Sequence, residues 1–306
     1  MIDLYPSRCA QETQILPRRD PVLHGNWTPD APLSREEARR FEEEGYLVLE
    51  DIFSSEEVAF LQNAAGALLA DPAALEAETV VAEPGSRDIR SVFRIHAQSR
   101  AMARLAADAR LAGIARFLLG DDIYLHQSRL NSKPGFQGKS FYWHSDFETW
   151  HVEDGMPRMR ALSMSVILTE NTPFNGPLML IPGSHRAFVT CLGETPENHY
   201  RTSLRRQEYG VPDEESLARL AARHGIVAQG GKPGTIILFD CNMMHGSNSN
   251  ITPFPRANAF FVYNAISNRL QAPYGTRKPR PSFIAARGVP EAIVPRHGLL
   301  LEETPA

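Results

Sequence analysis

Long apolar runs, basic clusters and paired cysteines are all scarce in this sequence of 306 residues. No apolar stretch approaches the roughly 20 residues that a membrane-spanning helix needs. The N-terminal residues carry acids and prolines, whereas a secretory signal has a basic start followed by an apolar run. We therefore expect a cytoplasmic protein that has no membrane partner.

Positive charge is not concentrated anywhere along the chain. The basic clusters are pairs such as Arg39-Arg40 and Arg205-Arg206, and the formal net charge is -4 with a pI near 6.2. A nucleic-acid-binding protein needs a patch of lysines and arginines that neutralises phosphates. The sequence therefore argues against a nucleic-acid partner.

The three cysteines, Cys9, Cys191 and Cys241, lie far apart in the chain. They do not form the C-x-x-C spacing that is typical of zinc and redox sites, and an odd number cannot all pair within one chain. We expect free, unreactive thiols.

The first hundred or so residues predict an extended arm followed by helices. Residues 1–33 are rich in proline and polar residues, which indicates the arm. Two capping boxes, at 34–37 and 54–57, predict helices from 35 to about 44 and from 55 to about 70. Between them YLVLEDIF predicts a strand, and apolar residues at helical spacing predict a third helix from about 100 to 119.

From residue 122 onward, short β-prone segments alternate with glycine and proline. They are IYLHQSRLN, SFYWHSDF, ALSMSVILT, PLMLIPG, GTIILFD and NAFFVYNAI. Short strands separated by turns predict a sandwich or barrel. The charged segment 187–231, with a helix expected from about 213 to 224, interrupts this pattern as an insertion or lid. We expect residues 34–306 to form a single, mainly β domain with helical support.

The stretch FYWHSDFETWHVEDGMP, residues 141–157, contains two histidines and four acids. If SFYWHSDF is a strand, His144 and Asp146 face the same side and can bind one metal ion. A third ligand must then come from elsewhere in the chain. The candidates are His151, His185, His199, His224 and His245.

His245 follows the predicted strand GTIILFD, and the small polar residues after it indicate a strand end that opens to a pocket. Two histidines and one carboxylate leave metal positions free for a co-substrate and dioxygen, as in non-haem Fe(II) oxygenases. Arg256, across the turn ITPFP, could bind the distal carboxylate of 2-oxoglutarate bidentately. Fe(II), Asp146, 2-oxoglutarate and Arg256 carry a formal total charge near zero, which a largely dry pocket can hold.

Each of these residues also has a structural interpretation. An H-x-D pair occurs by chance in many chains, and Arg256 could be an exposed residue of a proline-rich turn. His151 lies at an odd offset from His144 and in a predicted loop, and His185 in IPGSH is expected to brace a turn. The remaining acids are expected to be solvated or structural, and tryptophans such as Trp143 to be core; the acids are Glu148, Glu153 and Asp154.

Three motifs together resemble the phytanoyl-CoA dioxygenase superfamily of Fe(II)- and 2-oxoglutarate-dependent oxygenases. They are H-x-D at 144–146, L-x-L-I-P-G-S-H at 178–185, and P-G-x-x-x-x-F-D with H-G-S at 233–247. The resemblance spans about residues 45–265, and the stretch 141–157 resembles the signature of the ectoine hydroxylases within that superfamily. It implies a double-stranded β-helix core (jelly roll, cupin-like) flanked by helices, and it is compatible with a homodimer.

The resemblance also implies roles for individual residues. The iron ligands would be His144, Asp146 and His245. The 2-oxoglutarate contacts would be Arg256, Ser247, Phe141, Asn131 and Ser165. The ectoine contacts would be Gln127, Arg129, Thr149, Trp150 and Phe260. Because relatives that halogenate have a small residue in place of the carboxylate, Asp146 implies hydroxylation of ectoine to 5-hydroxyectoine, with release of succinate and carbon dioxide.

The residue types in the ectoine set suit a small cyclic zwitterion. Arg129 and the Thr149 hydroxyl can bind its carboxylate, and the Gln127 carbonyl can accept from a ring N–H. Trp150 and Phe260 offer aromatic faces to the delocalised cation. Three alternatives stay open: the same chemistry on another small zwitterion or imino acid, a non-catalytic jelly-roll module that binds a metal or solute, and a zinc hydrolase.

Overall fold

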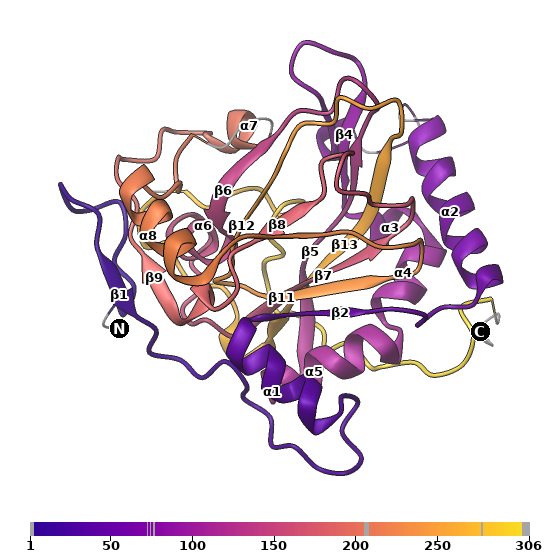
Figure 1. Ribbon diagram of the computed structural model, residues 1–306, viewed down its shortest axis with the longest axis horizontal. Helices are drawn as coiled ribbons and strands as arrows, with labels where there is room; N and C mark the ends of the chain where they lie inside the picture. The colour runs from indigo at the N-terminus through magenta and orange to yellow at the C-terminus, as the bar shows by residue number, and fades with distance from the viewer. Residues whose placement is uncertain are drawn as a thin grey trace.

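Two antiparallel sheets form the centre of the computed structural model, which describes residues 3–71, 73, 75, 77–204, 208–276 and 278–301 (Figure 1). The larger sheet has seven strands in the order β2-β11-β7-β13-β5-β4-β3, and the smaller sheet has four in the order β10-β8-β12-β6. A separate pair joins β1 to β9. The expected mainly β architecture is therefore confirmed.

The strand bounds follow the predicted segments closely in the second half of the chain. The larger sheet contains β2 Tyr46–Leu49, β11 Ile236–Asp240, β7 Ala161–Ile167, β13 Arg256–Ala265, β5 Ile123–Lys133, β4 Ile89–Phe93 and β3 Val80–Ala82. The smaller sheet contains β10 Val227–Gln229, β8 Leu178–Leu180, β12 Met244–Ser247 and β6 Phe141–Ser145. The separate pair is β1 Ile15–Pro17 and β9 Ala187–Val189. The strand predicted at 46–53 is shorter than expected, since β2 ends at Leu49.

The helices begin where the capping signals predicted. Both capping boxes are formed, at Ser34 before α1 and at Ser54 before α2, and Asp213 caps α8. Each cap supplies acceptors to backbone N–H groups that have no partner within the first helical turn. The helices are α1 Arg35–Glu44, α2 Ser55–Ala70, α3 Ile95–Gln98, α4 Arg100–Ala106, α5 Ile114–Leu119, α6 Asp146–Thr149, α7 Tyr200–Ser203 and α8 Glu214–His224.

The helix predicted over 100–119 is wrong as a single element. It is divided into α4, a π-helical turn Ala109–Gly113 and α5. The buried carboxylate of Asp108 accepts from the backbone N–H of Arg110 at 3.0 Å, which makes Asp108 a cap in the middle of the expected helix. A short polar side chain that bonds to its own backbone competes with helix continuation in this way.

Alternate residues of the larger sheet enter two different cores. Leu162, Met164 and Leu238 pack against helices on one face, whereas Ile237 and Phe239 pack on the other face with side chains of β8 and α6. This division follows from the two-residue period of a strand. The inner face, which looks toward the smaller sheet, is the face on which the polar residues of the site project.

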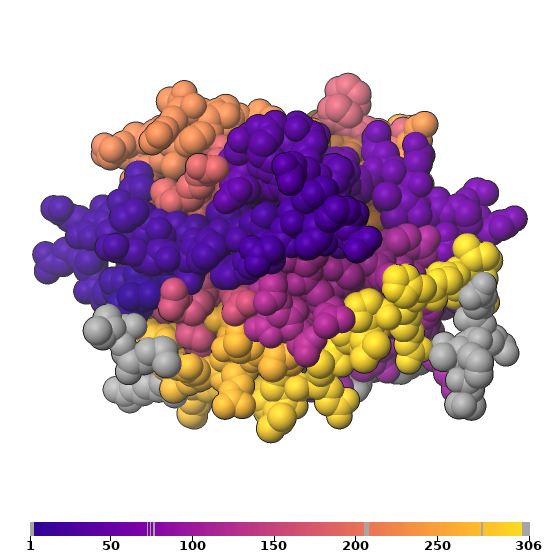
Figure 2. All heavy atoms as spheres, turned by 90° about the horizontal axis from the view of Figure 1, so that it is seen from below, coloured from indigo at the N-terminus to yellow at the C-terminus, as the bar shows by residue number. Residues whose placement is uncertain are grey.

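The N-terminal arm is joined to the body rather than projecting from it. It runs across one face of the molecule as a continuous band in Figure 2, and Tyr5 and Arg8 are buried. Strand β1 of the arm pairs with β9, and β10 pairs with β8, so strands near both ends of the segment 187–231 join sheets. Residues 205–207 of that segment lie outside the described residues, and its role as a lid stays a prediction. Among the residues that the structure describes, no helix is long and apolar enough to cross a membrane.

Candidate metal centre and cavity

His144 and His245 are brought together by strand pairing. Strands β6 and β12 are antiparallel neighbours in which these two residues are direct partners, and their ring centroids lie 4.2 Å apart. Each Nδ1 lies within hydrogen-bonding distance of a backbone carbonyl, Tyr142 O at 2.8 Å and Met243 O at 3.0 Å. When Nδ1 donates its proton there, the Nε2 lone pair is free to bind a metal.

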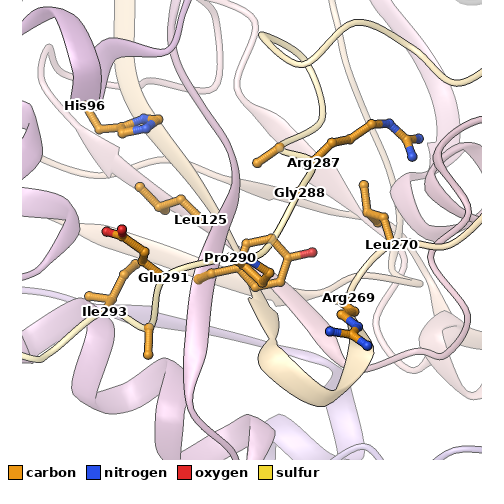
Figure 3. Close-up of a pocket in the computed structure, with 12 residues that line it drawn as sticks. His96, Leu125, Arg269, Leu270, Arg287, Gly288, Pro290, Glu291 and Ile293 are labelled. Atoms are coloured by element: carbon orange, nitrogen blue, oxygen red, sulfur yellow. The ribbon is translucent and has the colours of Figure 1, made fainter.

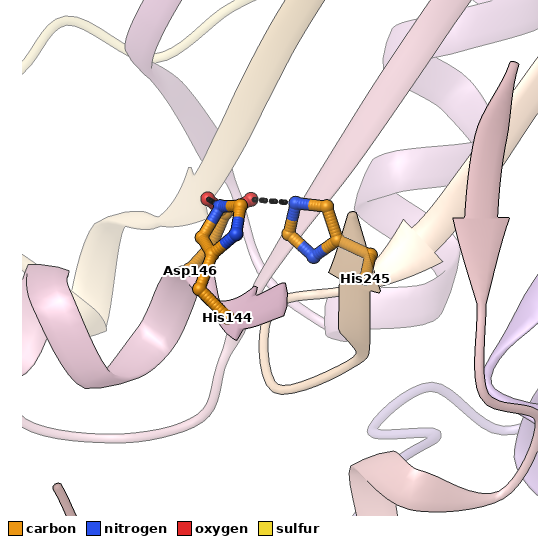
Figure 4. Close-up of side chains that lie close together, drawn as sticks. All are labelled: His144, Asp146 and His245. Carbon is orange, nitrogen blue, oxygen red and sulfur yellow. Dashed lines mark ion pairs between the residues drawn. The ribbon is translucent and has the colours of Figure 1, made fainter. Parts of the chain in front are cut away.

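Asp146 completes the group from the start of helix α6. Its carboxylate oxygens lie 3.6 Å from His144 Nε2 and 3.9 Å from His245 Nε2 (Figure 4). Among the described residues this is the one group of three His, Cys, Asp or Glu side chains whose ligand atoms all lie within 4.8 Å of one another. Two imidazoles and one carboxylate on one side of a metal are the donor set of non-haem Fe(II) oxygenases.

Two element assignments around this group differ from those expected. Strand β6 ends at Ser145, so Asp146 begins a helix instead of continuing the strand, and His245 lies within its own strand β12 instead of at the end of β11. The backbone N–H of Phe147 donates to Cys241 O, which turns the chain at this point. The convergence of His144 and Asp146 therefore comes from a strand-to-helix junction and not from strand alternation.

The protonation of the group suits metal binding. Burial and the neighbouring His144 lower the pKa of His245 to about 4, so its imidazole is neutral near pH 7. Burial would raise the pKa of Asp146, but His245, His144 and Arg129 outweigh it and hold the pKa of that carboxyl below its usual range. Ser163 donates to Asp146 at 3.2 Å. The triad thus presents a neutral His245 imidazole and an ionised Asp146 carboxylate, which are forms that bind a metal.

A cavity of about 100 Å³ lies between the two sheets beside the triad. Its lining includes seven residues that the sequence assigned to co-substrate or substrate: Arg129, Asn131, Phe141, Ser165, Ser247, Arg256 and Phe260. They come from β5, β6, β7, β12 and β13, and the antiparallel register sets Ser165, Phe260 and Arg129 side by side across three strands. The sheet topology therefore gathers residues that are far apart in the chain.

One end of the cavity is lined by the basic side chains Arg90, Lys133 and Arg256. Burial and the neighbouring Arg90 lower the pKa of Arg256 to about 10, and the Arg256 guanidinium donates to Gly176 O. Lys133, which the sequence reasoning missed, is buried and donates to Ser247 Oγ at 2.8 Å. Burial, followed by the charges of Arg256 and Arg90, lowers the pKa of Lys133 to about 6. This end of the cavity fits a small dianion.

Arg129, from β5, also lines this cavity. Its Nε is buried and has no hydrogen-bond partner among the described residues, and its guanidinium lies 4.5 Å above the Phe260 ring. Burial lowers the pKa of Arg129 to about 10, and Asp146 partly opposes this shift. A buried N–H needs an acceptor, which ordered water or a ligand in the cavity can supply. A ligand carboxylate meets this requirement.

Three of the residues expected to contact substrate lie outside the described lining of this cavity. The Gln127 side-chain amide donates to Ile284 O at 2.8 Å, and Trp150 is buried with its ring against His126. Thr149 lies on α6 beside Gly210. Their roles as substrate contacts stay predictions.

The alternative histidine ligands have other partners. His151 Nδ1 lies 2.8 Å from Met156 O and its Nε2 lies 2.9 Å from Asp3, within a π-helical turn rather than the expected loop. His185 is buried with Nε2 3.2 Å from Glu42 O, so it braces a turn as expected. The acids expected to be solvated or structural are buried and paired with arginines, so the structural interpretation holds; they are Glu148, Glu153 and Asp154.

A larger cavity of about 370 Å³ lies away from the triad (Figure 3). It is formed by His96, Leu125 and the segment 286–293, with Arg269 and Arg287 at its edge. Its described lining contains no group of three metal ligands. Size alone therefore does not mark the reactive site in this protein.

Comparison with known proteins identifies the family. Residues 41–258 match the family model described as phytanoyl-CoA dioxygenase. The chain belongs to the phytanoyl-CoA dioxygenase family. It is 71% identical over all 306 residues to the ectoine dioxygenase of Sphingopyxis alaskensis, with both chains covered completely. It is 55% identical over 285 residues to the ectoine dioxygenase of Stutzerimonas stutzeri, covering 93% of this chain and 94% of the relative.

This member of the phytanoyl-CoA dioxygenase family also superposes closely on solved structures of a protein from S. alaskensis. The structure of EctD from S. alaskensis with 2-oxoglutarate and 5-hydroxyectoine superposes with a TM-score of 0.91 at 67% identity, covering 98% of this chain and all of that chain. The structure of the same protein with bound Fe gives a TM-score of 0.88 at 65% identity, with the same coverage. The expected jelly-roll fold and the resemblance to ectoine hydroxylases are confirmed.

Proposed function

We propose that this chain hydroxylates ectoine to 5-hydroxyectoine, using Fe(II), 2-oxoglutarate and dioxygen and releasing succinate and carbon dioxide. One observation carries the proposal: the His144, Asp146 and His245 group adjoins a cavity lined by Arg256 and by Arg129, whose Nε has no hydrogen-bond partner among the described residues. The chain is a non-haem iron dioxygenase, and its near full-length similarity to ectoine dioxygenases supports ectoine as the substrate.

His144, Asp146 and His245 would hold the iron. The two Nε2 atoms and the ionised carboxylate fit Fe(II), and the bonds from each Nδ1 to a carbonyl keep the imidazoles oriented. When bound, Fe(II) supplies the activation of dioxygen that is coupled to oxidative decarboxylation of 2-oxoglutarate. The chain contributes the ligand geometry and leaves one side of the metal open toward the cavity.

Arg256 and Ser247 would bind the distal carboxylate of 2-oxoglutarate, and Lys133 adds a third donor next to Ser247. Phe141, Asn131 and Ser165 would line the remainder of this subsite. The Arg256 cation, with the Ser247 and Lys133 hydrogen-bond donors beside it in an enclosed space, favours an anionic co-substrate over a neutral molecule.

Arg129 would bind the ectoine carboxylate, since its buried Nε has no acceptor among the residues that the structure describes. The Phe260 ring, already in contact with Arg129, would face the substrate ring. Gln127 lies on β5 two residues from Arg129, and Thr149 and Trp150 follow Asp146 on α6 and the next turn. All three would contact the substrate from beyond the described cavity lining. These contacts would hold one C–H bond toward the metal and exclude water from the reaction.

The proposal includes a location and an assembly. We expect the enzyme to act in the cytoplasm, which is consistent with the metabolic substrate and with the absence of a membrane-spanning helix among the described residues. We also expect a homodimer, on the resemblance to the family. Sedimentation of the purified protein would test the dimer.

The test is turnover with purified protein reconstituted anaerobically with Fe(II), 2-oxoglutarate and ectoine and then exposed to oxygen. Mass spectrometry would count succinate and a product heavier than ectoine by one oxygen atom. We expect equal amounts of the two, and neither with His144→Ala. Succinate without the oxidised product would retain the oxygenase and reject ectoine, whereas no succinate at all would favour a binding module. Activity without dioxygen would indicate a zinc hydrolase.

A further inference from the structure

Helix α6 carries Asp146 of the triad, although the helix is only a single turn long. It covers Asp146–Thr149 and continues into the π-helical turn Trp150–Asp154. A helix this short is not stable by itself, because nucleation fixes several residues for few hydrogen bonds. The direction of the Asp146 carboxylate therefore depends on what the other side chains of these turns contact.

The contact on Glu148 comes from the N-terminal arm. Arg8 donates to both oxygens of Glu148, from Nε at 3.0 Å and from Nη2 at 2.7 Å, and Ser7 Oγ donates to Glu148 Oε1 at 2.6 Å. Both charged side chains are almost fully buried, with exposed fractions of 2% and 1%. A bidentate, desolvated pair of this kind fixes orientation as well as position.

Arg8 also bonds to the second turn and to the segment after β9. Its Nη1 donates to Glu153 Oε1 at 2.7 Å and to Thr195 Oγ1 at 2.5 Å. Arg280, from the C-terminal part of the chain, pairs with Asp154. The three buried acids that follow Asp146 are thus all held by arginines at positions outside the matched family region 41–258.

The backbone at Arg8 indicates that this position is over-determined. Arg8 has a φ of 59°, in the left-handed region that a non-glycine residue adopts at a cost. Its N–H donates to Cys191 O at 2.9 Å, and Cys191 N donates to Ser7 Oγ at 2.9 Å. These contacts stabilise the backbone conformation of Arg8 in which its guanidinium reaches Glu148 and Glu153.

We propose that Arg8 is a positioning residue that acts through Glu148 and Glu153 to set the Asp146 carboxylate and the wall formed by Thr149 and Trp150. Metal affinity and ectoine recognition then depend on the N-terminal arm, whereas 2-oxoglutarate binding at Arg256 does not. The part concerning ectoine rests on the proposed function, and the part concerning the metal does not. A purely structural ion pair would lower stability without changing either ligand affinity.

The test compares Arg8→Gln, Arg8→Lys and Glu148→Gln with the wild-type protein. Co(II) binding to the metal-free protein is measured by calorimetry, and ectoine binding is measured anaerobically in the presence of Fe(II) and 2-oxoglutarate. We expect Co(II) affinity to fall by about 10- to 100-fold in Arg8→Gln, the range for losing a partner that orients a metal ligand. The affinity of Arg8→Gln for ectoine should also fall, whereas its affinity for 2-oxoglutarate should stay unchanged. Arg8→Lys keeps the positive charge and should therefore lose less affinity for Co(II) and ectoine than Arg8→Gln.

Arg110→Gln is the matched control. Arg110 also forms a bidentate pair with a buried acid, Glu57, but it lies in the helical layer away from the triad. Loss of thermal stability in the Arg8 and Glu148 variants, with Co(II) and ectoine affinities unchanged as in Arg110→Gln, would overturn the proposal. If Arg8→Gln does not fold, Arg8→Lys and Glu148→Gln decide the result. If the wild-type protein binds Co(II) but does not turn over ectoine, the proposed function is wrong. The role of Arg8 in metal binding would then be tested by the Co(II) affinities alone.

Discussion

Arg129 and Arg256 line the cavity without an ion pair to any residue that the structure describes. Enclosing a charge without a partner destabilises a protein, so such residues are typical of a site whose ligand brings the opposite charge. The sequence suggested both residues: Arg256 follows His245 at the spacing of the next strand, and the resemblance to the dioxygenase superfamily implied Arg129. Lys133 could not be identified in the same way, since a lysine at a strand end is usually solvated.

Replacement of Arg256 by glutamine should change the affinity for 2-oxoglutarate and the stability of the ligand-free protein in different directions. We expect the affinity for 2-oxoglutarate to fall by on the order of 2–5 kcal/mol, because one partner of a desolvated charge pair is lost. The melting temperature of the ligand-free protein should stay equal or rise, because an enclosed charge without an ion pair is removed. Calorimetry and thermal unfolding with and without 2-oxoglutarate measure both quantities. The exposed Arg116, paired with Asp122, provides a control variant, Arg116→Gln, that should change neither; equal binding by wild-type and Arg256→Gln would contradict the assignment.

At the scale of elements, local signals predicted helix starts better than strand ends. Ser34 and Ser54 form their capping boxes as the sequence indicates, because such caps depend on neighbouring residues alone. The end of β6 at Ser145 was missed, because aromatic and polar residues alternate through Asp146 without a local break. The helix that begins there is stabilised by a tertiary contact, because Arg8 donates to Glu148, which lies 140 positions later. A short helix that depends on such a contact cannot be recognised from its own residues.

Gly45 lies at the C-terminal end of α1, next to the turn that contains His185. Its substitution tests how tightly the helix and the turn pack. Its φ is 81°, and a Cβ placed there would lie 2.3 Å from His185 Nδ1. Gly45→Ala should lower the free energy of unfolding by about 2–5 kcal/mol, through the left-handed backbone and the overlap together. Gly85 also has a positive φ, of 74°, but open space around it, so Gly85→Ala should cost only about 1–2 kcal/mol. Denaturant unfolding measures both, and equal losses would show that the overlap at Gly45 relaxes freely.

At the scale of the whole molecule, the sequence predicted the class of fold and the three residues of the metal group, but not how the ends of the chain support them. The buried pairs Arg8–Glu148 and Arg280–Asp154 join positions 140 and 126 residues apart. Nothing in the local pattern around Glu148 and Asp154 distinguishes a buried acid from a solvated one. The arm predicted at 1–33 is extended, yet several of its side chains belong to the interior.

The central claim is that one iron ion is held by residues from β6, α6 and β12. The most direct measurement is an anomalous-difference map at the iron absorption edge, from crystals reconstituted anaerobically with Fe(II). We expect a single peak bounded by His144 Nε2, His245 Nε2 and the Asp146 carboxylate, and its loss in Asp146→Ala. A peak bound by other residues, or none at this group in protein that turns over ectoine, would contradict the account.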